Sequence, residues 1–217
     1  MKNIKQQYEK WYYIAPFALI WLGLIEAKGI TDVISKETIQ IIPEAVTYSV
    51  LLSAIFSKFA WRWSIFRKYV VPFPDLEGTW TGYLYSTWKK NESDPELPPI
   101  PVQFCIKQSF ETVSIAMFTA ESESYSQAAL FTEEPDGTQR LKYTYSNTPE
   151  ATVRDRSEIH NGAANLKIVE KSDLALHGEY WTSRKSTGMI KVKRVSKKLS
   201  DCFIDDLDQW LKTKYGS

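Results

Sequence analysis

Three arginines, two tyrosines and a threonine in the second half of this 217-residue sequence have side chains suited to binding a ligand. They are Tyr145, Arg154, Arg156, Tyr180, Thr182 and Arg184. A guanidinium group offers paired hydrogen-bond donors to phosphate oxygens, and a tyrosine ring offers a face on which a nucleobase stacks. Any one of these arginines could equally be a solvated loop charge. Together they predict a site for phosphates and bases, provided that the fold gathers them.

Patterns typical of enzymes are absent from the sequence. The 2 histidines, His160 and His177, fall before a predicted strand and on an outward-facing strand position. There is no His-Glu-x-x-His, no Gly-x-Ser-x-Gly elbow and no glycine-rich phosphate loop. The 2 cysteines, Cys105 and Cys202, lie far apart, which argues against a disulfide framework or a zinc site. We therefore expect no enzyme activity, no catalytic residue, no metal and no cofactor.

Strand-like segments must position the candidate ligand residues. From residue 77 onward, eight segments alternate apolar and polar residues, and turn signals such as Glu134-Pro-Asp-Gly137 separate them. The expected strands are 77–88, 100–109, 112–120, 124–133, 138–147, 160–170, 173–183 and 187–195. Eight strands of this length predict a mostly β fold, an antiparallel up-and-down barrel with room for one small ligand. Outward lysines such as Lys142 and Lys191 argue against a barrel in lipid.

The first strand lies in the stretch 75–85, which contains a Gly-x-Trp pattern. Period-two alternation places Trp80 and Leu84 on one face. This tripeptide is similar to the first strand of lipocalins and fatty-acid-binding proteins, where the tryptophan plugs one end of a barrel, but an ordinary half-buried strand would also contain it. We expect Trp80 to be buried against Leu84, Leu176 and Val192.

An up-and-down order of strands sorts the loops between the two ends of the barrel. One end receives the connections 89–99, 120–123, 148–159 and 184–186. These include the longest loops, and small barrels usually admit ligands through the end with longer loops. The candidate arginines fall in these connections, with the tyrosines nearby, so we expect the ligand at this mouth.

Two apolar runs, Trp11–Ile25 and Ala45–Ser57, precede the barrel. Lysines and arginines flank both runs on their outer sides, while the connection between them is mostly acidic. The positive-inside rule then predicts a transmembrane hairpin with both ends in the cytoplasm. Each run is shorter than the roughly 20 residues that comfortably span a bilayer, so a buried helical hairpin is the alternative.

The expected domain organisation has three parts. Residues 1–70 form the two-helix transmembrane hairpin, and residues 71–200 form the ligand-binding barrel. Apolar residues at helical spacing from Phe203 to Leu211 predict a short amphipathic helix over 201–217. The formal net charge of only +1 argues against a DNA or RNA partner.

The whole arrangement resembles a known family of bacterial effectors. The features are two N-terminal spans, the strand Leu76-Glu-Gly-Thr-Trp-x-Gly82, and closing strands with Gly178-x-Tyr and Gly188-x-Ile. They resemble the two-helix transmembrane, β-strand-rich effectors of CBASS, the cyclic-oligonucleotide-based antiphage signalling systems of bacteria. The resemblance covers nearly the whole chain and rests mainly on architecture.

The resemblance implies a function. In that family a lipocalin-like barrel binds a cyclic dinucleotide made by a partner nucleotidyltransferase. Binding drives oligomerisation of the membrane helices, which disrupts the inner membrane and halts infected cells. The implied partners are a cyclic dinucleotide, membrane lipid and further copies of the chain. The implied location is the bacterial inner membrane, multi-pass, with the barrel in the cytoplasm. The six candidate ligand residues come from the loop argument and not from the family.

Two other functions stay open at this point. A membrane-tethered, lipocalin-like carrier or chaperone would need an apolar interior for its ligand. A structural adaptor would have a filled barrel without a cavity. A nucleotide sensor instead needs arginine, tyrosine and threonine side chains facing inward near one mouth.

Overall fold

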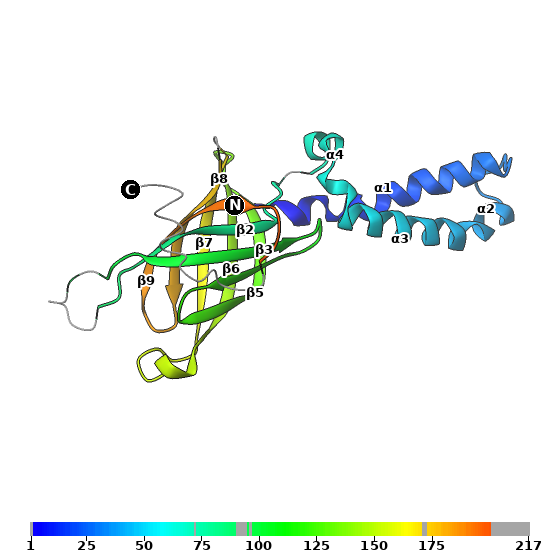
Figure 1. Ribbon diagram of the computed structural model, residues 1–217. Coiled ribbons are helices and arrows are strands. Elements are labelled where there is room, and N and C mark those ends of the chain that lie inside the picture. Colours follow the sequence, from blue (N-terminus) through cyan, green and yellow to red (C-terminus); the bar gives the residue numbers. More distant parts are fainter. Residues whose placement is uncertain (1, 72, 90–94, 96, 171–172, 201–217) are drawn as a thin grey trace. The chain divides into compact units, whose positions relative to one another are not determined.

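The computed structural model of the chain covers residues 2–71, 73–89, 95, 97–170 and 173–200 (Figure 1). The chain divides into two compact units. One unit contains residues 3–74 together with residues 109–111, and the remaining described residues form the other. The amphipathic helix predicted for 201–217 lies outside the described residues.

The first unit is helical. A two-residue strand, β1 (Lys2–Asn3), precedes the first helix, and the division between the two units falls within it. The helices are α1 (Ile4–Ala27), α2 (Lys36–Gln40), α3 (Ile42–Lys58), the 3-10 turn η1 (Ala60–Arg62) and α4 (Ser64–Tyr69). Helices α1 and α3 pack against each other. The buried residues of α3 are small ones at a spacing of four, Ala45, Ser49, Ser53 and Ser57. Such a stripe lets two helices approach closely.

A side-chain cap marks the start of α2. The Ser35 hydroxyl accepts a hydrogen bond from the Thr38 backbone N–H (3.2 Å) and caps α2.

Among the described residues, the segment Lys36–Lys58 is the one helical stretch long and apolar enough to cross a membrane, and Tyr13–Ala27 is apolar but shorter. Length and composition therefore agree with one predicted span, and the two-span topology stays a prediction.

The second unit is a closed β-barrel. Its strands are β2 (Gly78–Ser86), β3 (Ile100–Gln108), β4 (Val113–Phe118), β5 (Ser122–Glu133), β6 (Gln139–Pro149), β7 (His160–Glu170), β8 (Leu174–Thr182) and β9 (Thr187–Ser196). All neighbours pair antiparallel in the order β5-β4-β3-β2-β9-β8-β7-β6, and β5 also pairs with β6. That last pairing closes the sheet, so the barrel has no open edge (Figure 1). The predicted mostly β fold and eight-stranded antiparallel barrel are confirmed, and each strand lies within a few residues of its predicted span.

Trp80 lies in the core of this barrel, as its position in β2 predicts. Its side chain is fully buried, and its indole N–H donates to the Leu76 carbonyl (2.9 Å). The expected neighbours Leu84, Leu176 and Val192 are buried as well. Leu84 and Ser86 share the face of Trp80 in β2 and line the interior cavity of the barrel, so the predicted inward face of β2 is the correct one.

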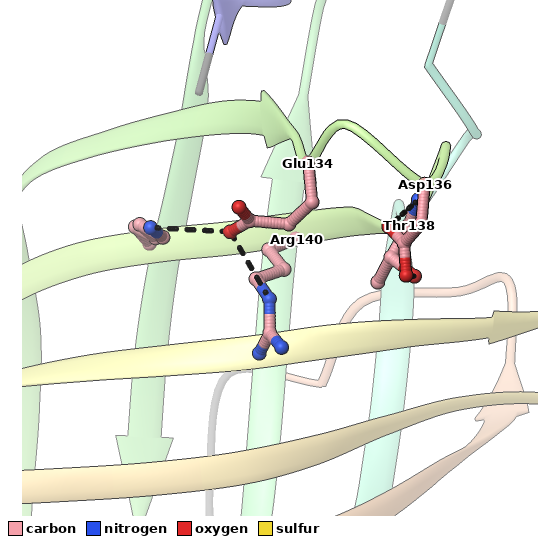
Figure 2. Close-up of polar contacts among 5 residues, drawn as sticks. Glu134, Asp136, Thr138 and Arg140 are labelled. Carbon is pink, nitrogen blue, oxygen red and sulfur yellow. Dashed lines mark hydrogen bonds and ion pairs between the residues drawn. The ribbon is translucent and has the colours of Figure 1, made fainter.

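The hairpin between β5 and β6 forms at the predicted Pro-Asp-Gly turn (Figure 2). Gly137 adopts a positive φ of 79°, a conformation that residues with a Cβ rarely accept. The Asp136 carboxylate accepts from both the backbone N–H (2.9 Å) and the hydroxyl (3.0 Å) of Thr138. These bonds hold the pKa of Asp136 below its ordinary value. Glu134 pairs with Arg140 across the hairpin (3.4 Å).

Candidate ligand-binding site

The barrel unit contains a cavity of about 530 Å³. Its walls come from the ends of the strands and from residues in four connections, so it lies at the predicted mouth. The residues from the connections are 88, 97–99, 119–121, 153, 156–157, 184 and 186. Protein pockets for small molecules typically enclose roughly 300–1,000 Å³. The cavity is therefore large enough for one small ligand. A filled barrel, as a structural adaptor would have, does not describe this chain.

Five of the six predicted ligand residues line this cavity. They are Tyr145, Arg156, Tyr180, Thr182 and Arg184. Strands β6 and β8 supply the tyrosines and the threonine, and two loops supply the arginines. Their contacts with a ligand stay a prediction.

Tyr145 and Tyr180 are held in place by glycines on neighbouring strands. Tyr145 pairs with Gly162 of β7, and Tyr180 pairs with Gly188 of β9. A side chain at Gly162 would collide with the Tyr145 ring, and one at Gly188 would collide with the Tyr180 ring. The two rings occupy the space that a Cβ would fill, so these glycines fix where the rings lie.

Both tyrosines keep their protons at neutral pH. Burial raises the pKa of the Tyr145 hydroxyl well above its ordinary value of 10.0, and burial also raises the pKa of Tyr180. Tyr180 also shares a hydrogen bond with Ser86, which lines the cavity too. These side chains therefore present neutral hydroxyls and apolar ring surface to the cavity.

The two arginines that line the cavity have different partners. Arg156 forms an ion pair with Glu121, with 2.6 Å between Nη2 and Oε1. Arg184 Nη1 donates to the Ser157 hydroxyl (3.1 Å). Glu121 and Ser157 also line the cavity. A phosphate that binds there would meet one arginine paired with a carboxylate and one held by a neutral hydroxyl.

Arg154 does not line the cavity. The 3-10 turn η2 (Ala151–Val153) begins the loop after β6, and Arg154 caps its C-terminal end. The Arg154 Nε donates to the Pro149 carbonyl (3.2 Å) instead. The turn of the backbone thus separates Arg154 from Arg156, although the two lie two residues apart in the sequence.

Thr182 belongs to a tight turn between β8 and β9. Its hydroxyl pairs with the Ser186 hydroxyl (2.7 Å), and its backbone N–H donates to the Ser186 carbonyl (2.9 Å). Lys185 completes the turn with a φ of 61°, in the left-handed region that few residues other than glycine adopt. This turn carries Arg184 and sets where its guanidinium group lies.

Another part of the cavity wall combines apolar and polar side chains. Leu84, Ile100 and Met117 contribute apolar surface, while Asn147 and Ser122 contribute polar groups. Asn147 Nδ2 donates to Ser124 Oγ (2.8 Å) and to Ser122 Oγ (3.1 Å). Sequence reasoning missed these residues. The signal available was Asn147 itself, a polar residue on the inward-facing positions that Tyr143 and Tyr145 also occupy.

His160 also lines the cavity, next to Asn147 across the β6–β7 pairing. Burial lowers its pKa below the ordinary value of 6.5, and the nearby Arg184 charge lowers it further. A hydrogen bond to the Glu158 carbonyl (2.8 Å) acts in the opposite direction. Among the described residues no group of three histidine, cysteine, aspartate or glutamate side chains could hold a metal ion.

Comparison with known proteins identifies the family. Residues 71–194 match the model of the Cap15 cyclic dinucleotide receptor domain. The chain belongs to the Cap15 cyclic dinucleotide receptor family. A protein from Staphylococcus schleiferi named CD-NTase-associated protein 15 is 29% identical over 157 residues, which are 72% of this chain and 80% of that protein.

The Cap15 match covers the cavity and most of the barrel. All eight strands begin within residues 71–194, and the residues that line the cavity all fall inside that span. The Cap15 family and its staphylococcal relative support the resemblance to a CBASS effector with a cyclic dinucleotide receptor domain.

Proposed function

We propose that this chain is a membrane-anchored sensor that binds a cyclic dinucleotide in the barrel cavity. One observation carries the proposal: the cavity of a Cap15-type receptor domain gathers two arginines, two tyrosines and a threonine at one mouth. Arg156 and Arg184 bind the phosphates, because guanidinium offers paired donors to phosphate oxygens. Tyr145 and Tyr180 contact the bases, and Thr182 adds a hydrogen bond. The chain acts as a receptor and not as an enzyme.

The N-terminal helices carry out the response to ligand binding. Residues 1–70 anchor the chain in the bacterial inner membrane with both ends in the cytoplasm, and residues 71–200 form the receptor. Binding of the cyclic dinucleotide promotes association of several copies, and the associated helices disrupt the membrane. A ligand shifts such an equilibrium only by its difference in affinity between the assembled and isolated forms. The ligand must therefore bind the assembled form more tightly.

A binding experiment tests the proposal. The full-length chain in detergent is titrated by calorimetry with cyclic di-AMP, cyclic di-GMP and cyclic di-UMP, and with a long-chain fatty acid. We expect saturable binding of at least one cyclic dinucleotide. We also expect loss of that binding in the triple variant Tyr180→Ala, Thr182→Ala, Arg184→Ala. Tight binding of the fatty acid alone would favour the lipocalin-like carrier, for which the apolar residues Leu84, Ile100 and Met117 would be the wall.

A second experiment tests the response separately. Co-expression with a nucleotidyltransferase that makes the bound cyclic dinucleotide should permeabilise the inner membrane to a normally excluded dye. The triple variant should leave the membrane intact at equal protein level. Permeabilisation that is the same without the synthase would show that the ligand does not control the helices.

A further inference from the structure

A polar group lies deep in the wall of the cavity. Asn147 lines the cavity and is only 5% exposed, and it follows Tyr145 on the inward-facing positions of β6. Leu141, Tyr143 and Tyr145, which precede it on that face, are apolar or aromatic and buried. Burying a side-chain amide is costly unless it is hydrogen-bonded. The buried amide of Asn147 is therefore expected to make hydrogen bonds.

Two serines use both amide hydrogens of Asn147. Nδ2 donates to Ser124 Oγ (2.8 Å) and to Ser122 Oγ (3.1 Å). Ser124 is the residue paired with Asn147 across the β5–β6 register, and the Ser122 hydroxyl also pairs with that of Thr119 (3.0 Å). A side-chain amide has two hydrogens and one acceptor oxygen. In this orientation the serines accept both amide hydrogens, and the amide oxygen is the remaining hydrogen-bonding group.

The oxygen of this amide has no donor in the part of the chain that the structure describes. Successive inward residues of a strand lie roughly 7 Å apart. A base that contacts Tyr145 from the cavity would therefore bring its polar edge close to Asn147. Adenine, guanine and uracil all carry an N–H on that edge, and an amide oxygen is a suitable acceptor for it.

We infer that Asn147 contacts a base of the ligand, by accepting a hydrogen bond from an N–H on the edge of that base. Ser122 and Ser124 are positioning residues that orient the amide. The inference rests on the proposed binding of a cyclic dinucleotide in this cavity. It adds a difference in role: the arginines bind phosphate whatever the base, whereas Asn147 requires a base that carries an N–H.

The test separates these two roles by comparing probes that differ only in the base. Calorimetry on the full-length chain uses cyclic di-AMP, cyclic di-GMP, cyclic di-UMP, and a cyclic dinucleotide of two purine ribosides, whose bases carry no N–H. Wild-type protein should bind its preferred probe at least tenfold more tightly than the purine riboside probe. A site built around a hydrogen bond rejects an analogue that cannot make it.

Substitutions then test whether Asn147 causes the difference in affinity between the probes. The ratio to follow is the affinity for the preferred probe divided by the affinity for the purine riboside probe. Asn147→Leu should reduce this ratio to near one, and Ser124→Ala should reduce it in part. Asn147→Asp retains an acceptor oxygen and should keep the ratio while weakening all probes through its charge. Arg184→Ala should weaken all probes by the same factor. Thr148→Leu, at the exposed neighbouring position, should change neither quantity.

The outcomes are distinguishable. A ratio that survives in Asn147→Leu, or an equal loss for all probes in that variant, overturns the inference and leaves the proposed function standing. Wild-type protein that binds the probes equally also overturns it. Wild-type protein that binds none of the probes overturns the proposed function and this inference together. If Asn147→Leu does not fold, the ratios measured for Ser124→Ala and Asn147→Asp decide the same question.

Discussion

Arg156 and Arg184 line the same cavity but differ in what a ligand must displace. The Arg156 ion pair with Glu121 involves side chains that are 65% and 53% exposed. Exposed pairs of this kind contribute about 0–1 kcal/mol, so a phosphate can replace the carboxylate. Within the part of the chain that the structure describes, the Arg184 guanidinium donates to a single neutral hydroxyl, that of Ser157.

Arg184→Ala should weaken cyclic dinucleotide binding by about 1.5–3 kcal/mol, the range for a hydrogen bond to a charged group. The melting temperature should change little, because a loop arginine at a mouth contributes little packing. Calorimetry and thermal unfolding check the two quantities. Arg154→Ala is the matched control, since that side chain donates to Pro149 and does not line the cavity. Equal losses in both variants would contradict the assignment.

Glu121→Gln should tighten cyclic dinucleotide binding. The substitution removes a negative charge from the cavity in which we propose that a dianion binds, and it frees Arg156 from its ion pair. The gain should be a few-fold, as expected for an exposed pair, and should diminish as salt rises. Titrations at two salt concentrations measure it. Weaker binding in this variant would show that the carboxylate contacts the ligand directly, for example at a base N–H.

At the scale of elements, β2 connects the core to the mouth. Trp80 near its start is fully buried, and Leu84 and Ser86 near its end line the cavity. The Arg194 guanidinium lies over the Trp80 ring at 5.9 Å and donates to the Asp75 carbonyl (2.7 Å). The start of β2 is thus fixed by its own core residue and by the end of β9.

Trp80→Ala should lower the free energy of unfolding of the barrel by about 3–5 kcal/mol, as for other truncated core aromatics. The loss includes the indole hydrogen bond to Leu76. Urea unfolding followed by circular dichroism measures it. Trp88→Ala is the control, because Trp88 is 46% exposed, and it should have a far smaller effect. A cost below about 1 kcal/mol for Trp80 would mean that the core does not depend on it.

At the scale of the whole molecule, the first question is how the helical unit meets a membrane. Segment Lys36–Lys58 has the length and composition of a span, and basic residues follow it. The positive-inside rule then predicts that the connection between the two apolar runs lies outside the cytoplasm.

Ile34→Cys tests this topology. Ile34 is 91% exposed, and it precedes Ser35, whose capping role makes Ser35 itself a poorer choice. In a background of Cys105→Ala and Cys202→Ala, a membrane-impermeant maleimide should label position 34 from the periplasmic side of intact cells. Labelling that needs access from the cytoplasm would contradict the predicted topology.

The stability of the barrel should fall as the pH decreases through 6.5. Burial lowers the pKa of His160 and of His177, and Lys191 and Lys193 lower that of His177 further. The unfolded chain therefore binds more protons than the folded chain in this window, so unfolding becomes easier as the pH falls. Thermal unfolding at pH 7.5 and 5.5 measures the decline.

The double variant His160→Gln, His177→Gln serves as the control. It should show a smaller decline between these two pH values, because the histidine contribution is gone. An unchanged decline would assign the effect to carboxylates instead.

Much of the barrel follows from the sequence because the signals involved are local. Period-two alternation identifies the inward residues of a strand, such as Trp80 on β2 and Tyr180 on β8, whatever the rest of the chain does. The Pro-Asp-Gly turn before Thr138 likewise carries its own conformational preference. An up-and-down order then assigns each loop to an end, which is how the mouth and five of its residues could be predicted.

Tertiary structure alone decided the rest. Which loop arginine faces the cavity depends on the turn η2, which directs Arg154 to Pro149 and leaves Arg156 at the mouth. The positions of the Tyr145 and Tyr180 rings depend on Gly162 and Gly188, because strand register brings these glycines opposite the two tyrosines. The orientation of Asn147 depends on serines from the neighbouring strand. Register and loop direction arise from pairings between distant residues, so no local pattern in the sequence contains them.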